Sequence, residues 1–477
     1  MKTQAQLPPG PPPLPLLGNL LQIRTGELLA SLQKFREEYG PVFTVHFGSR
    51  PVVMLCGYNA IKEALVDQKH AFSGRGKMPI NDYVMKGYGI TASNGERWKQ
   101  MRRFTLTTLR NFGVGKRSIE ERIQEEAQFL LEEFQKTGEK PFDPTFFLSC
   151  AVSNIICSVV FGNRFEFSDQ RFLSLLRNIN GIIRYMASAW NLVLYNFPQL
   201  FRHIPGPHQR ILKHISELKT FVRERVEESK ESLDPQSPRH FIDCFLIKMQ
   251  QDMMTPDTEF HMENLVASTV NLFFAGTETV STTLRYGFLI LLKYPEIQAK
   301  VQNEIDQVMG HQYPSVNDRA RMPYTEAVIH EIQRFGDIIP TGLPHTTTED
   351  VQFQNYLIPK GTDVFPLLTS SLKDPEHFPN PEVFLPERFL DNQGNVKKNP
   401  ALLPFSAGRR ICPGEGLART EIFLFVTTIL QKFTLTTSVS QEELDLSPEI
   451  SSSGHLPRSY KIRAVPRTRN VPSSIPS

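Results

Sequence analysis

The residue most able to do chemistry in this chain is Cys412. It lies in the segment Phe405-Ser-Ala-Gly408-Arg-Arg410-Ile-Cys412-Pro-Gly414, just before an apolar run that predicts a helix. A thiolate at a helix start is stabilised by the helix dipole and by backbone N–H groups. Gly408 permits a tight turn, and Gly414 lets the helix approach a flat object closely. Arg410 could pair with a carboxylate on that object, although a lone cysteine is more often a buried free thiol.

A second candidate lies in the middle of a long predicted helix, in the motif Ala275-Gly276-Thr277-Glu278-Thr279. The apolar pattern of residues 261–293 predicts one helix about 50 Å long, which must cross the whole domain. Gly276 costs roughly 1 kcal/mol relative to Ala inside a helix, so a specific reason for it is expected. The hydroxyl of Thr279 can compete for the Ala275 carbonyl and open a local groove. Without the other motifs, this threonine would be an ordinary tolerated helix residue.

Two further pairs could bind or balance charge. Trp98 and Arg102 lie one turn apart on a predicted helix, and both can donate hydrogen bonds to a carboxylate, the arginine through two N–H groups. Glu331 and Arg334 have a similar spacing, but an exposed pair of this kind contributes only about 0.2–0.5 kcal/mol. Neither pair identifies a function without the Cys412 segment.

Taken together, these motifs resemble the cytochrome P450 superfamily of haem-thiolate monooxygenases. The Cys412 segment resembles the superfamily's haem-binding signature, and Glu331-Ile-Gln-Arg334 with Pro386-Glu-Arg388-Phe389 resembles its structural triad. The likeness is greatest to the second family of vertebrate microsomal drug-metabolising enzymes, in Phe274-Ala-Gly-Thr-Glu-Thr279 and Met322-Pro-Tyr-Thr-Glu-Ala-Val-Ile-His-Glu-Ile-Gln-Arg334. The resemblance implies a mainly α fold with a small β-rich region (α+β), with haem between the long helix and the Cys412 loop.

The resemblance also implies a role for each candidate residue. Cys412 would be the ligand of the iron in haem b, Thr279 and Glu278 would deliver protons, and Arg388 would join Glu331 and Arg334 in a buried scaffold. Further contacts to haem would come from Phe405, Gly414, Ala275, Arg410, Trp98, Arg102, Arg75 and His345. The substrate would be surrounded by Met78, Thr91, Ile183, Phe274, Ala275, Ile339, Leu343 and Ser453. For Arg75 and His345 the alternative is an ordinary loop residue, and for each substrate position it is core packing.

The implied reaction inserts one atom of O2 into a lipophilic small molecule, such as a xenobiotic, a steroid or a fatty acid. Electrons would come from NADPH through a flavoprotein reductase, and the anionic sulfur would favour O–O cleavage. Lys99, Arg103 and Arg110 form a basic stripe about 100° further round the helix that carries Trp98 and Arg102. This stripe is either the reductase docking site or a solvated face with no partner.

Three other functions are compatible with parts of the sequence. One is a haem-thiolate isomerase or dehydratase that rearranges peroxides, against which the Glu278-Thr279 pair argues because such enzymes need no oxygen-linked proton delivery. Another is a haem carrier or gas sensor. The third is a thiol hydrolase that uses Cys412, which would need a histidine base within reach.

Bulk properties narrow the class of protein. The chain has 477 residues, 40% of them hydrophobic, and a net charge of only +3, so it is globular and unlike a nucleic-acid-binding protein. Its five cysteines are odd in number and widely spaced, which argues against a disulfide framework and indicates a reducing compartment. No run reaches the roughly 18 apolar residues of a membrane span. The resemblance implies the cytoplasmic face of the endoplasmic reticulum membrane. Since the family's N-terminal anchor is not seen, we expect a soluble form, with membrane contact in a full-length one.

Three segments are predicted along the chain. They are a polar and proline-rich leader at 1–16, a single catalytic domain at 17–463, and a polar, disordered tail at 464–477. Apolar periodicity predicts helices at 28–39, 96–112, 118–136, 172–232 with breaks at Pro198 and at 204–207, 295–309, 324–335 and 414–433. A hairpin is predicted at 42–56, strand-like chain at 351–366 and ordered coil at 374–404. The apolar cluster at 190–201 is interpreted as core packing or as a lid that touches a membrane surface.

Overall fold

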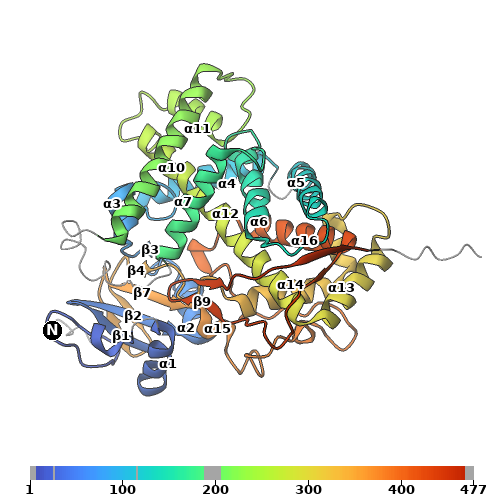
Figure 1. Ribbon diagram of the computed structural model, residues 1–477. Helices are drawn as coiled ribbons and strands as arrows, with labels where there is room; N and C mark the ends of the chain where they lie inside the picture. The colour runs from blue at the N-terminus through green and yellow to red at the C-terminus, as the bar shows by residue number, and fades with distance from the viewer. Residues whose placement is uncertain (1–6, 25–26, 114–116, 187–205, 468–477) are drawn as a thin grey trace, which may run out of the picture.

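The protein is described by a computed structural model that covers residues 7–24, 27–113, 117–186 and 206–467. Helices form most of the molecule, and the main sheet lies at the lower left of Figure 1, beside the N-terminus. The predicted α+β fold class is confirmed. The apolar cluster at 190–201 lies outside the described residues. Within the ranges given above, no helix is long and apolar enough to cross a membrane.

The helices predicted from apolar periodicity are present, most of them at nearly the predicted bounds. Those of the described ranges are α1 Leu28–Tyr39, α2 Gly57–Lys62, α3 Pro79–Met85, α4 Gly95–Asn111, α5 Arg117–Lys136, α6 Thr145–Val160, α7 Gln170–Met186, α10 Pro207–Glu231, α11 Phe241–Gln251, α12 Met262–Lys293, α13 Pro295–Val308, α14 Pro323–Gly336, α15 Leu368–Leu372 and α16 Glu415–Lys432. The predicted helical stretch 172–232 corresponds to α7 and α10. The predicted coil at 374–404 contains only the short 3₁₀ turn Pro386–Phe389.

The main sheet has the strand order β1-β2-β7-β4-β3 and brings together distant parts of the chain. The strands of the described residues are β1 Val42–Phe47, β2 Arg50–Cys56, β3 Gly74–Arg75, β4 His345–Thr346, β5 Val351–Phe353, β6 Tyr356–Ile358, β7 Asp363–Leu367, β8 Phe433–Thr436, β9 Pro448–Ser451, β10 His455–Pro457 and β11 Arg463–Pro466. The predicted hairpin is β1 and β2, which pair antiparallel, while β2 and β7 pair parallel. At the far edge, β3 pairs with β4 so that Arg75 faces His345 in the register.

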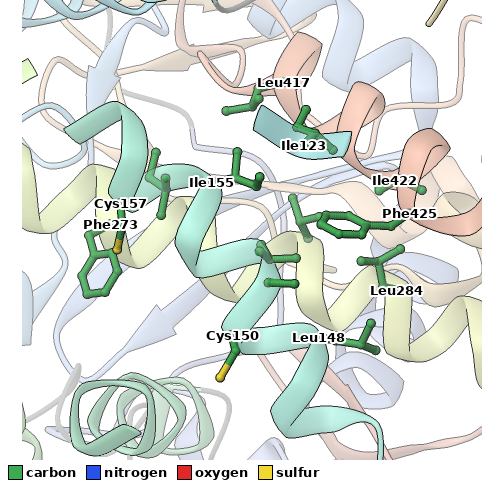
Figure 2. Packing of buried hydrophobic residues seen from close by; sticks show 14 of the residues in the cluster. Ile123, Leu148, Cys150, Ile155, Cys157, Phe273, Leu284, Leu417, Ile422 and Phe425 are labelled. Atoms are coloured by element: carbon green, nitrogen blue, oxygen red, sulfur yellow. The ribbon is translucent and has the colours of Figure 1, made fainter. Parts of the chain in front are cut away.

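The helical core is centred on α6 and α12, which pack together along their lengths (Figure 2). Helix α6 was not predicted, because it is apolar nearly all round and so lacks the periodicity of a helix with one wet face. Gly276 of α12 lies against α6: a Cβ atom there would come within 3.0 Å of Ile156. This close approach supplies the reason that a glycine inside the long helix required. Figure 2 shows side chains of α5 and α16 completing the same cluster.

The predicted leader and tail both have structured parts. Residues 7–16 of the leader are not helical and lie along β1, where the backbone N–H of Thr44 donates to the Pro9 carbonyl over 2.8 Å. The prediction that a disordered tail begins at residue 464 is wrong for its first residues. Ala464 pairs with Leu435 between the antiparallel strands β11 and β8, and it is buried. The tail was predicted to be disordered because its composition is polar, and that average does not reveal the apolar alanine and valine of this short strand.

Candidate functional site

The predicted tight turn before Cys412 is present. Gly408–Arg410 form one turn of 3₁₀ helix, and the backbone N–H of Cys412 donates to the Phe405 carbonyl over 3.1 Å. Gly408 has a φ of +72°, and a Cβ atom there would lie 1.8 Å from the carbonyl oxygen of Leu65. Glycine alone satisfies both the positive φ and the close approach. The turn therefore delivers Cys412 to the start of α16.

Cys412 differs from the other cysteines in its exposure. Its side chain is accessible, whereas three others are buried: Cys56, Cys150 and Cys157. Packing on its remaining sides desolvates the Cys412 thiol and raises its pKa, while the N–H groups of Gly414 and Glu415 donate to the sulfur and lower it. Coordination to a metal ion deprotonates a thiol. An accessible cysteine at a helix start, with backbone N–H groups that favour its thiolate, therefore suits a metal ligand better than a structural thiol.

Three arginines converge beside the Cys412 turn. Arg75 donates from Nε to the Thr91 carbonyl over 3.0 Å and from an Nη atom to the Pro344 carbonyl over 3.0 Å. Arg410 donates from Nε to the Ser73 carbonyl over 2.9 Å, and Arg102 donates to the Ile411 carbonyl over 2.6 Å. Each guanidinium thus donates to backbone carbonyl groups. Arg75 and Arg410 are buried.

This arginine cluster (Arg75, Arg102 and Arg410) lacks a counter-charge. Within the described part of the chain, none of the three forms an ion pair with a carboxylate, and one Nη atom of Arg410 is buried without any hydrogen bond. Burial is the main cause that lowers the pKa of Arg410 to about 8, and the charges of Arg75 and Arg102 add to it. Burial also lowers the pKa of Arg75 to about 10, with a smaller contribution from the charge of Arg102. Buried cations of this kind require an anion. The cluster fits a flat group that carries carboxylates, such as the two propionates of haem.

Trp98 and His345 lie in the same cluster but contact it differently. Trp98 is buried, and the guanidinium carbon of Arg410 lies 4.0 Å from the centroid of its ring. The Nδ1 atom of His345 lies 2.8 Å from the Phe72 carbonyl, so this nitrogen carries the proton. Burial, followed by the charges of Arg75 and Arg410, lowers the pKa of His345 to about 3. A neutral His345 therefore presents Nε2 as an acceptor, and it could donate to a carboxylate only as an imidazolium.

The middle of α12 carries the second candidate group. The predicted hydrogen bond is confirmed: Thr279 Oγ1 donates to the Ala275 carbonyl over 2.8 Å. Thr279 is half-buried and Ala275 is exposed, although most of α12 is buried. Glu278 faces the protein interior, where burial raises the pKa of its carboxyl to about 7 and the charge of Arg285 only partly opposes this. The motif therefore combines an accessible hydroxyl with an acid that can hold a proton at neutral pH.

A cavity links this part of α12 to the Cys412 turn. Thr279 and Val280 line it from α12, and Phe405, Ala418 and Ile422 line it from the loop before Cys412 and from α16. Thr279, predicted to deliver protons, and Phe405, predicted to contact haem, therefore line the same cavity. Gly414 leaves room beside the sulfur, since a Cβ atom there would meet only the Cys412 Sγ, at 3.8 Å.

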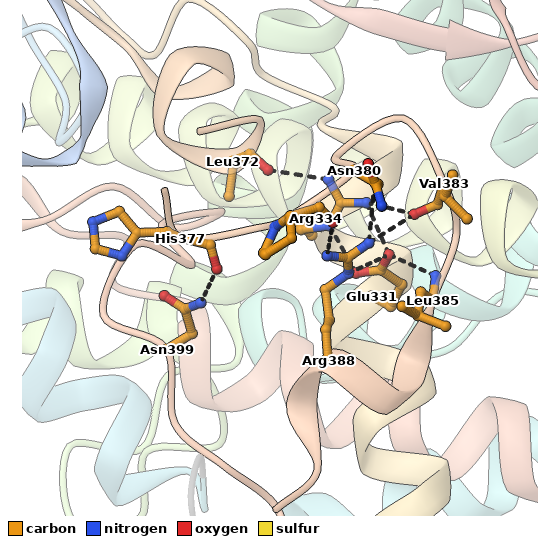
Figure 3. A network of polar contacts seen from close by, with 10 residues as sticks. Glu331, Arg334, Leu372, His377, Asn380, Val383, Leu385, Arg388 and Asn399 are labelled. Atoms are coloured by element: carbon orange, nitrogen blue, oxygen red, sulfur yellow. Dashed lines mark hydrogen bonds and ion pairs between the residues drawn. The ribbon is translucent and has the colours of Figure 1, made fainter. Parts of the chain in front are cut away.

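Glu331, Arg334 and Arg388 form a buried network (Figure 3). Arg334 donates to both carboxylate oxygens of Glu331, over 2.7 and 2.8 Å, and Arg388 donates to the same carboxylate over 3.1 Å. The remaining guanidinium N–H groups donate to backbone carbonyls, those of Leu372 and Val383 among them. Arg388 joins Glu331 as expected, and its association with Arg334 runs through this shared carboxylate.

The predicted substrate residues share partial exposure. All eight are accessible to some degree, Ala275 most of all. Asn271 of α12 accepts a hydrogen bond from the Thr91 backbone over 3.1 Å, and Ser453 Oγ donates to the carbonyl of Met186, at the end of the helix that carries Ile183, over 2.5 Å. Among the described residues, no hydrogen bond links Met78 to this group.

Several residues that organise the site escaped the sequence analysis. Asn94 accepts hydrogen bonds from the backbone of Arg75 over 2.6 Å and from the guanidinium of Arg410 over 3.1 Å. Arg419 of α16 contacts Glu415 and the ring of Phe405. No motif marks either residue, because their roles depend on contacts between segments distant in sequence. The basic stripe is on the surface: Lys99, Arg103 and Arg110 are all exposed.

Comparison with known proteins shows which family the chain is similar to. The chain matches the cytochrome P450 family over residues 8–463. It is 57% identical over 463 residues to cytochrome P450 2G1 of Oryctolagus cuniculus, covering 97% of this chain and 94% of that protein. It is 54% identical to cytochrome P450 2A13 of Homo sapiens over 467 residues, 98% of this chain and 94% of the relative. Cytochrome P450 2C8 of Homo sapiens is also 54% identical, over 462 residues, with 97% and 94% covered.

Proposed function

Because the chain belongs to the cytochrome P450 family, we propose that Cys412 is the proximal ligand of its haem iron. The family's enzymes are monooxygenases that insert one atom of O2 into lipophilic small molecules, with electrons from NADPH supplied by a reductase. Haem b supplies the oxygen-activating chemistry when bound. The observation that carries the assignment is the accessible Cys412 side chain, which the Gly408–Arg410 turn delivers to the start of α16.

The arginine cluster holds the propionates in this proposal. Two carboxylates would supply the negative charge that Arg75, Arg102 and Arg410 lack, and would give the free Nη atom of Arg410 a partner. Hydrogen bonds in which both partners are charged are roughly twice as strong as neutral ones. Trp98 supports the cluster through the face of its ring, and His345 would contribute a donor if a carboxylate raises its pKa.

Protons reach the oxygen-binding side through Glu278 and Thr279. A carboxyl with a pKa of about 7 can both give and take a proton near neutral pH. The Thr279 hydroxyl uses its own proton toward the Ala275 carbonyl, so its oxygen is free to accept a proton donor from the accessible side. The two side chains are adjacent in sequence but point about 100° apart on the helix. Glu278 is therefore the proton source inside the protein, and Thr279 is the relay at the groove.

The substrate would lie over the accessible strip of α12. Phe274 and Ala275 are accessible there, with Thr91 held against the same helix by Asn271. Most of the proposed lining is apolar: Met78, Ile183, Phe274, Ala275, Ile339 and Leu343, with the hydroxyls of Thr91 and Ser453. Such a lining selects lipophilic molecules by shape and desolvation, which fits a xenobiotic, steroid or fatty-acid substrate.

We also propose a reductase surface and a membrane-facing region. The exposed side chains of Lys99, Arg103 and Arg110 lie on α4, the helix that carries Arg102 of the cluster. Two leucines near the N-terminus, Leu16 and Leu21, are 84% and 70% exposed, as suits contact with a lipid surface. These features support a location at the cytoplasmic face of the endoplasmic reticulum membrane.

The ligand assignment is tested by replacing Cys412 with serine. The reduced wild-type protein under carbon monoxide should have the strongly red-shifted Soret band of thiolate-ligated haem, and Cys412→Ser should lose it. Cys157→Ser serves as the control, because this buried thiol should leave the band unchanged. Full intensity in Cys412→Ser would refute the assignment.

A further inference from the structure

A partly buried ion pair lies on the first turn of α16, directly behind the Cys412 turn. Arg419 donates from Nε to Glu415 Oε1 over 3.0 Å and from an Nη atom to the side-chain oxygen of Gln333, on α14, over 3.3 Å. Its guanidinium carbon also lies 5.0 Å from the centroid of the Phe405 ring. Arg419 thus connects three segments around the site: α16, α14 and the loop before Cys412.

The position of Glu415 makes its charge important. Glu415 is the first residue of α16, three positions after Cys412, and its carboxylate charge acts on the Cys412 thiol and raises its pKa. A negative charge this near the sulfur disfavours any further electron density there. The Glu415 and Arg419 side chains are 32% and 19% exposed, so water screens the pair only in part. Among the described residues, the Arg419 guanidinium is the cation in contact with the Glu415 carboxylate.

We propose that Arg419 is a positioning residue that sets the electron affinity of the haem iron by neutralising Glu415. The proposal rests on Cys412 as the iron ligand and adds a residue that does not touch the haem. An unpaired Glu415 would favour the oxidised iron, whereas an unpaired Arg419 would favour the reduced iron. The Arg419 guanidinium contacts the Phe405 ring, and the Phe405 carbonyl accepts a hydrogen bond from the Cys412 backbone N–H. This contact holds the guanidinium beside the Cys412 turn.

The test is a double-mutant cycle in which the reduction potential of the iron is measured. Arg419→Gln should make the potential more negative, by an amount that shifts the oxidised-to-reduced ratio about threefold. Glu415→Gln should shift the potential in the opposite direction, and the double variant should return it close to the wild-type value. Arg419→Lys, which keeps the charge, should retain most of the wild-type potential. Lys230→Gln, which breaks the exposed pair with Glu227 on α10, is the matched control and should change nothing.

Three outcomes would overturn the proposal. Arg419→Gln with a wild-type potential but a raised requirement for reductase would identify a docking residue instead. Equal shifts in Arg419→Gln and in the double variant would indicate distortion of the turn rather than charge. If Arg419→Gln does not retain haem, the reduction potentials of Glu415→Gln and Arg419→Lys test the proposal instead. An unchanged potential in Glu415→Gln would then refute it. Absence of the thiolate Soret band from the wild-type protein would be a different result from these three, because it would refute Cys412 as the ligand.

Discussion

Two groups of buried arginines in this molecule are balanced in opposite ways. In the network of Figure 3, Arg334 and Arg388 share the carboxylate of Glu331 and donate their other N–H groups to carbonyls. In the arginine cluster beside Cys412, Arg75 and Arg410 are also buried, yet they have only carbonyl partners and one unsatisfied Nη atom. The first group is complete within the chain. The second requires an anion from outside it.

This difference separates a structural role from a binding role. A buried cation is tolerated when the fold itself supplies the opposite charge, and removing that charge then damages the fold. A buried cation without such a partner destabilises the free protein and stabilises the complex with an anionic ligand. The haem propionates are the anion that the second group would bind, so it should respond to haem while the first should not.

The largest effect is expected from the first group. Glu331→Gln should reduce the free energy of unfolding by about 3–5 kcal/mol, because two buried guanidinium groups lose their counter-charge. Glu387→Gln is the control: it breaks an exposed pair with Lys300 close to Arg388 and should cost less than about 1 kcal/mol. Denaturant unfolding of both variants measures this. Equal losses would remove the distinction between the two kinds of charge.

A smaller effect is expected at Glu278, a buried acid with no strong ion pair. Its pKa is raised from the usual 4.5 to about 7, mainly by burial. Between these values the folded protein holds a proton that the unfolded chain has lost, so the free energy of unfolding falls as pH rises. This loss amounts to about 3 kcal/mol at most. Glu278→Gln should abolish it when unfolding is compared at pH values below and above this window. Parallel pH profiles of the two proteins would contradict the assignment of a protonated Glu278.

The smallest effect is expected from the exposed stripe, whose charges are screened by water and, at Lys99, by an exposed ion pair with Glu96. Replacing Lys99 and Arg103 with Glu should slow reductase-supported turnover about threefold to tenfold, most at low salt, and leave peroxide-supported turnover unchanged. Arg117→Glu is the control, since this arginine is 89% exposed and lies on α5. Equal loss of both activities would indicate a folding defect, and no loss would make the stripe an ordinary solvated face.

Much of the fold could be predicted from periodicity, and the exceptions have physical reasons. Helices with one wet face, such as α4 and α5, were predicted almost to the residue. Helix α6 was missed because burial on all sides removes the periodic signal. The strand β11 was assigned to the tail, because its pairing with β8 depends on a partner distant in sequence.

The site could be predicted as a set of residues but not as a balance of charges. The motif around Cys412 and the Thr279 hydrogen bond follow from local spacing. That Arg75 and Arg410 lack a carboxylate partner, and that Asn94 connects them, depends on the pairing of β3 with β4 and on the approach of the Cys412 turn. Local sequence contains no signal for an absent partner. The same holds for the contact of Arg419 with Gln333.

The most direct test of the charge account compares two forms of haem in two proteins. Wild-type protein should retain haem b in preference to its dimethyl ester, which lacks the propionate charges, by about tenfold or more. Arg410→Gln should lose most of this preference, whereas Arg409→Gln, at the neighbouring residue paired with His70, should keep it. The measurement is the ratio of the two haems bound at equilibrium by haem-free protein. An undiminished preference in Arg410→Gln would contradict the account.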